Sequence, residues 1–194
     1  MFIVYAVPLG LIAGLLVGGR LDGLSTLRFR WAWVAIGGLV AQIVLFSGAV
    51  DEAIAGWGPL LYVGSTAAVL AAVLRNVATP GLVIVALGAV SNLAAIVANG
   101  GYMPADPAAL ALAGSRDSGS YSNSVVADSA ALWPLTDIFA IPEPLPLANV
   151  FSVGDVLIGI GVTLTIVLAM RRVTTPHDPA ADRTTTVRAG TSPD

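Results

Sequence analysis

The sequence predicts an all-α fold, a polytopic integral membrane helix bundle with five transmembrane helices. Of its 194 residues 56% are hydrophobic and only 11% are charged, which is typical of a chain whose solvent is largely lipid. The apolar residues gather in five segments of about the length that crosses a hydrocarbon core of about 30 Å. These segments are residues 2–19, 31–49, 59–74, 81–98 and 153–170. Backbone groups in lipid must bond within their own segment, so we expect helices rather than strands.

The arginines predict how the chain is oriented. They stand between the first and second segments, after the third and after the fifth, so all but one share a side. The arginines on that side are Arg20, Arg28, Arg30, Arg75, Arg171, Arg172, Arg183 and Arg188, and Arg116 falls on the other. The positive-inside rule then places the N-terminus outside and the C-terminus in the cytoplasm. We expect a multi-pass protein of the bacterial cytoplasmic (inner) membrane.

Small residues predict how the first segment packs. Gly10, Gly14 and Gly18 recur every four residues and form one small face of a helix. Close backbone approach at such faces holds helices together in lipid, where no hydrophobic force acts between them. Packing within the bundle is the favoured interpretation. The alternative is docking onto another membrane protein or a second copy of the chain.

Two amides lie near the middle of apolar segments, Gln42 in the second and Asn92 in the fourth. A buried amide in lipid is costly unless it is paired, so we expect Gln42 and Asn92 to bond each other across two helices. Such a pair is more typical of structural glue than of a transport path. No acidic or basic residue lies at mid-membrane, which weighs against ion-coupled pumps.

The fourth segment is followed by an outer loop or strap, residues 99–152. Gly100 and Gly101 can end the helix in the left-handed conformation. Asp106 and Pro107 then favour a short helix over about residues 107–113, as N-cap and first helical residue. The later part is apolar but interrupted by prolines, so it cannot span a membrane. We expect it to lie over the outer ends of the helices.

The candidate functional residues are Asn99, Ser152 and Asp155, because the topology puts the end of the fourth helix and the start of the fifth on the outer face. Ser152 and Asp155 have the spacing of a capping box, which is the favoured interpretation of the pair. The alternative is a small-ligand pocket, since an amide, a hydroxyl and a carboxylate under an apolar roof are what such a pocket needs.

The remaining residues limit the chemistry. The chain has no cysteine and a single histidine, His177, so we expect no metal site and no cofactor in the membrane domain, residues 1–172. Residues 173–194 lack apolar periodicity and are expected to form a disordered cytoplasmic tail. The expected partner is the lipid bilayer, and nothing suggests a nucleic acid.

Three stretches carry a family resemblance: "GLIAGLLVGGRLDGLSTLRFRW", "NGGYMP" after the fourth segment and "NVFSVGDVLIGIG" at the fifth. With them the chain resembles a bacterial family of small multi-pass membrane proteins known only as a domain of unknown function. The resemblance covers most of residues 1–171, and residues 115–133 depart most from it. It implies that residues 18–20, 99–104 and 152–155 matter together, and it supplies no reaction, cofactor or substrate.

Three functions therefore compete. The first is a non-enzymatic accessory or scaffold protein of a membrane complex, favoured because the membrane segments carry no catalytic constellation. The second is an outer-face enzyme or a lipid- or small-molecule-binding protein, with Asp155 as acid/base or orienting group and Asn99 as a polarising amide. The third is a small-solute transporter. Whether the protein is an enzyme stays open.

Overall fold

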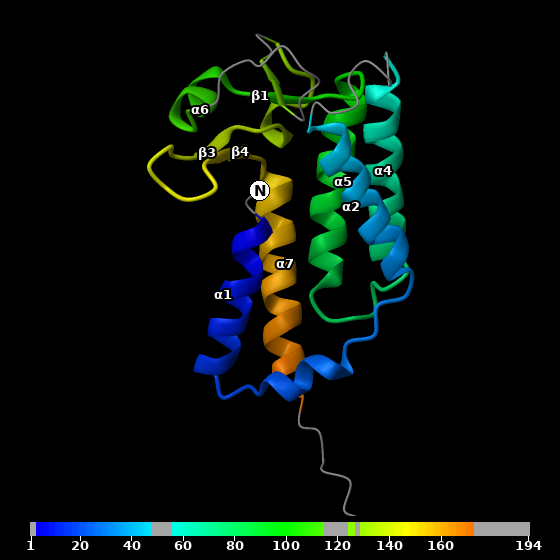
Figure 1. Ribbon diagram of the computed structural model, residues 1–194, viewed down its shortest axis with the longest axis vertical. Helices are drawn as coiled ribbons and strands as arrows, with labels where there is room; N and C mark the ends of the chain where they lie inside the picture. The colour runs from blue at the N-terminus through cyan, green and yellow to red at the C-terminus, as the bar shows by residue number, and fades with distance from the viewer. Residues whose placement is uncertain (1–2, 48–55, 115–123, 127–128, 173–194) are drawn as a thin grey trace, which may run out of the picture.

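The computed structural model describes residues 3–47, 56–114, 124–126 and 129–172 (Figure 1). Within these residues the chain is mostly helical, which confirms the predicted all-α class. The predicted disordered tail, residues 173–194, and Arg116 lie outside the described residues.

Five apolar helices occupy the five predicted segments. They are α1 (Ile3–Leu16), α2 (Ala32–Leu45), α4 (Gly58–Leu74), α5 (Leu82–Ala98) and α7 (Val153–Met170). Of the described helices, only α7, with 18 residues, is long and apolar enough to cross a membrane by length and composition. The other four are apolar but shorter, at 10–17 residues.

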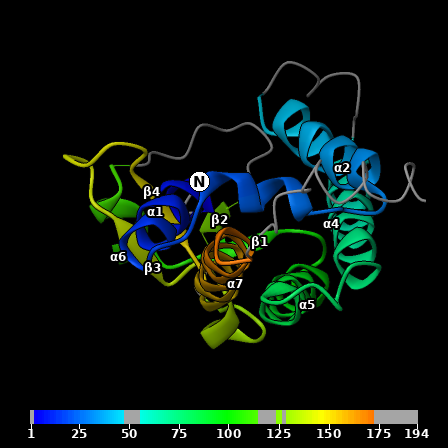
Figure 2. The ribbon, with the colours of Figure 1, turned by 90° about the horizontal axis from the view of Figure 1, so that it is seen from below.

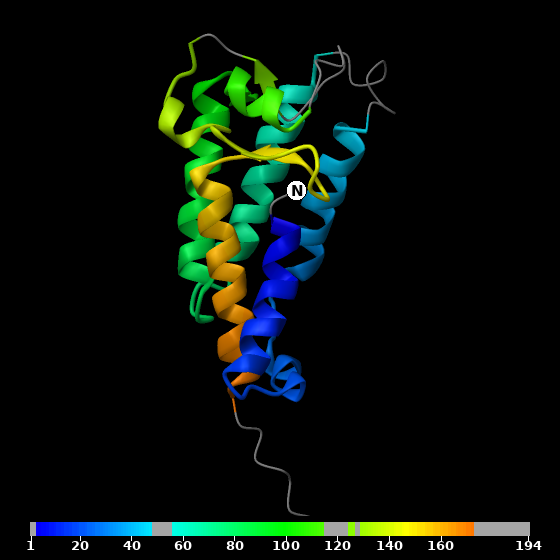
Figure 3. The same ribbon diagram turned by 90° about the vertical axis from the view of Figure 1, so that its left-hand side faces the viewer.

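The five helices form a row in the order α1, α7, α5, α4 and α2 (Figure 2). They run along the long axis of the molecule, with the short strands at one end and the 3-10 helix η1 (Leu21–Thr26) at the other (Figure 3). Buried apolar side chains from α4 and α5 pack with Ile158 and Val162 of α7. A second cluster joins α2, α4 and α5 to the strand end through Leu45, Tyr62, Ala95, Ile96 and Met103.

The glycine face of α1 packs against α7, as predicted for two of its three members. A Cβ atom on Gly10 would lie 3.0 Å from Ile166 Cβ, and one on Gly14 would lie 3.0 Å from Met170 Cε. The prediction is wrong for Gly18. Because α1 ends at Leu16, Gly18 lies in the following turn, with φ +78°, and apart from its chain neighbours no atom lies within 4 Å of where its Cβ would be.

The segment between α5 and α7 folds into a small unit of its own rather than a single extended strap. Its elements are β1 (Met103–Ala105), α6 (Pro107–Leu112), β2 (Ser124–Val126), the 3-10 helix η2 (Trp133–Leu135), β3 (Phe139–Ile141) and β4 (Asn149–Phe151). Strands β1 and β2 pair in parallel, and β3 and β4 pair antiparallel. The unit lies at the end of the bundle where α5 ends and α7 begins (Figure 1).

The local predictions for this segment are confirmed. Gly100 and Gly101 end α5 with φ of +72° and +90°. Helix α6 has the predicted position, and the Asp106 carboxylate caps it by accepting hydrogen bonds from the backbone N–H groups of Ala108 (2.8 Å) and Ala109 (3.1 Å). Each of these features depends on neighbouring residues alone.

Candidate functional site

Helices α5 and α7 are antiparallel and approach each other through glycines. Gly88 faces Gly154, and Gly81 faces Gly161. A Cβ atom on Gly88 would lie 2.9 Å from the backbone nitrogen of Ile158, and one on Gly161 would lie 2.8 Å from the Gly81 carbonyl oxygen. Both distances are too short for a side chain, so backbone packs on backbone here, which strengthens dispersion contacts between helices.

This close contact brings Asn92, one turn after Gly88, against the first turn of α7, where Ser152 is the N-cap and Asp155 the third residue. The Ser152 hydroxyl donates to Asn92 Oδ1 (2.7 Å), and Asn92 Nδ2 donates to Asp155 Oδ1 (2.9 Å). The Ser152 N–H donates to Asp155 Oδ2 (3.1 Å), and the Asp155 N–H donates to Ser152 Oγ (3.0 Å). The predicted capping box is confirmed, and Asn92 closes it into a ring. We call Asn92, Ser152 and Asp155 the polar ring.

The polar groups of the ring find their hydrogen-bond partners within the protein. Ser152 is 0% exposed, and Asn92 and Asp155 are half-buried. Both carboxylate oxygens of Asp155 accept hydrogen bonds, and its negative charge stands at the positive end of the α7 dipole. Because Ser152 follows β4 directly, the ring joins α5, α7 and the strand unit. Among the described residues, no three His, Cys, Asp or Glu side chains group so as to hold a metal ion.

Asn99 does not join Ser152 and Asp155, so the predicted grouping of these three residues needs correction. Asn99 Nδ2 donates to the carbonyl oxygens of Ala131 (2.9 Å) and Ala95 (2.8 Å), and Asn99 Oδ1 accepts from the Ala131 N–H (2.9 Å). The reason is the relative height of the two helices. Helix α5 continues about 10 Å beyond Asn92 to reach Asn99, whereas α7 begins lower (Figure 1).

The predicted pairing of Gln42 with Asn92 is wrong. Gln42 Nε2 donates to Thr66 Oγ1 (3.2 Å), because α2 packs on α4. Asn92 faces the opposite neighbour of α5, where Ser152 and Asp155 take both ends of its amide. Both amides are hydrogen-bonded, as expected, but they have different partners because α2 and α5 are not neighbours in the row of helices.

The sequence did not predict a role for Asn76, but it binds backbone groups as Asn99 does, and we call these two residues the asparagine clamps. Asn76 is 6% exposed and follows the end of α4. Its Nδ2 donates to the carbonyl oxygens of Arg30 and Ala72, and its Oδ1 accepts from the Arg30 N–H, all at 2.7 Å. Both asparagines bond the carbonyl four residues earlier and pair with the backbone of a distant segment. The sequence feature that could have predicted both clamps is an asparagine just after an apolar helical segment.

A family model described as "Family of unknown function (DUF5317)" matches residues 26–167. The match begins at the end of η1 and ends within α7, so it includes the polar ring and both asparagine clamps and leaves out α1, which the predicted resemblance had included. No curated protein and no solved structure matches the chain.

Proposed function

Because the chain belongs to this family of unknown function, its role has to be inferred from its own residues, and we propose that it is a five-span membrane protein acting as a non-enzymatic accessory or scaffold subunit of a membrane complex. The proposal has three parts, insertion, orientation and role, which rest on different observations.

The observation that carries insertion is the apolar outer surface of the helices. Large apolar side chains point outward along all five, as on α2, where Trp33 is 76%, Ile36 61% and Ile43 66% exposed. Soluble monomers rarely expose continuous apolar surface of this kind. Asp155, at the first turn of α7, is the one charged residue within the five helices. Lipid is the solvent that suits such a surface.

Helix length is compatible with insertion. At a rise of about 1.5 Å per residue, α4 and α5 are about 26 Å long and α1 and α2 about 21 Å. Apolar Val17 follows α1 and apolar Phe46 follows α2, which extends the hydrophobic stretch. A bilayer can thin locally around a short span at modest cost.

Charge supports the orientation. The described arginines flank η1 or follow α4 and α7, and hydrogen bonds from Arg20 N–H to the Met170 carbonyl (2.7 Å) and from Asn76 to Arg30 bring these segments to one end. We assign this end to the cytoplasm of a bacterial cell and the strand unit to the outside. The tail, residues 173–194, follows α7 and is then cytoplasmic.

The scaffold role is favoured because the polar ring has a structural role, which is to hold α5, α7 and the strand unit together. Both carboxylate oxygens of Asp155 accept hydrogen bonds within the protein. Asn99, which would be the polarising amide of an outer-face enzyme, is hydrogen-bonded to Ala131 instead. Two glycines are open to a partner helix, since a Cβ atom on Gly37 or Gly64 would meet nothing within 4 Å.

Insertion and orientation are tested by fractionation and reporter fusions. The full chain should stay in the membrane pellet after an alkaline carbonate wash. A fusion at the C-terminus should be fluorescent with a cytoplasmic reporter and inactive with a periplasmic one, and a fusion after residue 114 should show the reverse. Release by carbonate, or the same reporter result at both positions, would refute the five-span topology.

The scaffold role is tested by gentle extraction of the tagged protein and its native mass. A stoichiometric protein partner, or a defined homo-oligomer, is expected. Gly64→Leu and Gly37→Leu should remove that partner without unfolding the bundle, whereas Gly88→Leu, in the α5–α7 contact, should unfold it. A monomer that carries one specific small molecule would refute the scaffold role and favour an outer-face binding protein.

A further inference from the structure

The end of the bundle opposite the strand unit carries every arginine of the described residues. We call Arg20, Arg28, Arg30, Arg75, Arg171 and Arg172 the arginine collar. All six side chains are exposed. Asp22 is the one described acidic residue at this end, and the other described carboxylates, Asp106, Asp137, Glu143 and Asp155, belong to the strand unit and the first turn of α7. The described part of the molecule is therefore strongly polarised along its long axis.

The backbone beneath the collar is held firmly. Gly23 of η1 packs on the last turn of α7, where a Cβ atom would lie 2.9 Å from Met170 Cα. The Arg20 N–H donates to the Met170 carbonyl (2.7 Å), and Asn76 holds both backbone polar groups of Arg30. The segment between α1 and α2 is thus fixed at both ends through backbone groups, and these bonds do not use its exposed guanidinium groups.

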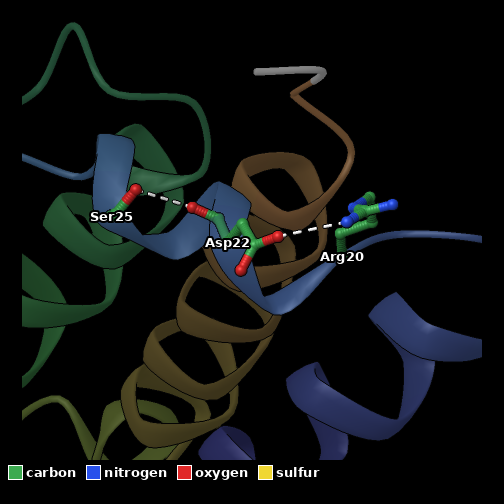
Figure 4. A network of polar contacts seen from close by, with 3 residues as sticks. All are labelled: Arg20, Asp22 and Ser25. Carbon is green, nitrogen blue, oxygen red and sulfur yellow. Dashed lines mark hydrogen bonds and ion pairs between the residues drawn. The ribbon is translucent and has the colours of Figure 1, made fainter. Parts of the chain in front are cut away.

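The collar is barely neutralised by the protein itself. Within the part of the chain that the structure describes, the one ion pair joins Arg20 to Asp22 at 3.3 Å, and the two side chains are 79% and 70% exposed (Figure 4). An exposed pair of this kind contributes little, because water and salt screen it. Figure 4 also shows Ser25, whose hydroxyl donates to the Asp22 carbonyl oxygen (2.7 Å) and stabilises the turn.

Apolar side chains are interleaved with these arginines. Leu21, Phe29, Trp31 and Trp33 are all exposed. Trp31 adopts φ +61°, a left-handed conformation that is rare for an aromatic residue. Tryptophan and arginine together are typical of the headgroup level of a bilayer, where an indole ring has apolar and polar neighbours at once.

We propose that the arginine collar is a docking surface for anionic phospholipid headgroups, in which guanidinium groups bind phosphate oxygens and the aromatic rings lie against the acyl chains just below. The inference rests on the proposed five-span topology. The guanidinium fork matches phosphate geometry and can bind it with two hydrogen bonds. Among the described residues of this end, six arginines stand against one aspartate, which favours an anionic lipid over a zwitterionic one. The fixed backbone favours lipid that stays bound after extraction.

The experiment measures phosphatidylglycerol binding to the purified full chain in mild detergent, by native mass titration, with phosphatidylcholine as comparison. Wild type should bind phosphatidylglycerol more tightly. Arg28→Gln with Arg30→Gln should weaken that binding by about fivefold for each arginine, or about 30-fold for the pair. These changes spare the backbone groups that Asn76 holds. Arg28→Lys with Arg30→Lys keeps the charge but loses the guanidinium fork, so its binding should lie between that of wild type and that of the glutamine variant.

The matched control is Arg183→Gln with Arg188→Gln, which removes the same charge from the tail and should leave binding unchanged. Equal binding of the two lipids by wild type, or equal loss in the tail control and the collar variant, would overturn the inference. Reconstitution into lipid nanodiscs separates the two proposals. A chain that inserts but shows no lipid preference refutes only the collar site, and a chain that does not insert refutes the topology.

Discussion

Replacing Asn92 with alanine tests whether the polar ring is the structural tie between α5, α7 and the strand unit. The substitution removes the hydrogen bond to the charged Asp155, which costs about 1.5–3 kcal/mol, and leaves the buried Ser152 hydroxyl without its acceptor, which costs about 1–3 kcal/mol. We expect the free energy of unfolding to fall by about 3 kcal/mol, toward the lower part of that sum, because unfolded helices in a lipid environment also find polar partners.

The assay is denaturant unfolding of the full chain in mild detergent, followed by tryptophan fluorescence. The matched control is Asn99→Ala, which removes three hydrogen bonds, two of them to exposed backbone groups of Ala131. Water can replace those two, so the control should cost only about 1 kcal/mol. The most informative result is therefore which of the two variants loses more free energy of unfolding.

A double-mutant cycle isolates the ring itself. Asn92→Ala and Asp155→Ala should be coupled by about 1.5–2 kcal/mol, because each removes the partner of the other. Losses that add to within about 0.5 kcal/mol, the behaviour of independent sites, would refute the reasoning. So would an Asn99→Ala variant that is less stable than Asn92→Ala.

The remaining predictions concern the other contacts. Gly88→Ala should destabilise the protein by about 1–3 kcal/mol through overpacking of the α5–α7 contact, whereas Gly64→Ala should be neutral or stabilise by about 0.5–1 kcal/mol through helix propensity, and thermal unfolding in detergent measures both. Asn76→Ala should cost about 2 kcal/mol and speed proteolysis between η1 and α2, and unchanged digestion there would contradict the clamp. Gly18→Ala should cost about 1–2 kcal/mol from its left-handed backbone alone, and no loss in the same assay would contradict that conformation.

Features that depend on neighbouring residues were predictable from the sequence. The apolar segments became α1, α2, α4, α5 and α7. The Asp106 cap, the glycine end of α5 and the capping box of Ser152 and Asp155 also formed as expected. In each case the interacting groups lie within a few residues, so residue type and spacing decide the outcome.

The sequence by itself therefore determined which segments are helical and how α6 and α7 are capped, although α1 and α2 end earlier than predicted. The tertiary structure decided which polar groups meet. Asn92 and Asn99 are two turns apart along α5. Asn92 joins the polar ring because the first turn of α7 lies beside it and does not reach Asn99. Gln42 bonds Thr66 because α2 lies beside α4, and Asn76 becomes a clamp because the segment before α2 passes it. All five helices are apolar around most of their surface, so the pattern does not encode which faces pack. That choice is made by close glycine contacts between distant segments, which the finished fold alone brings together.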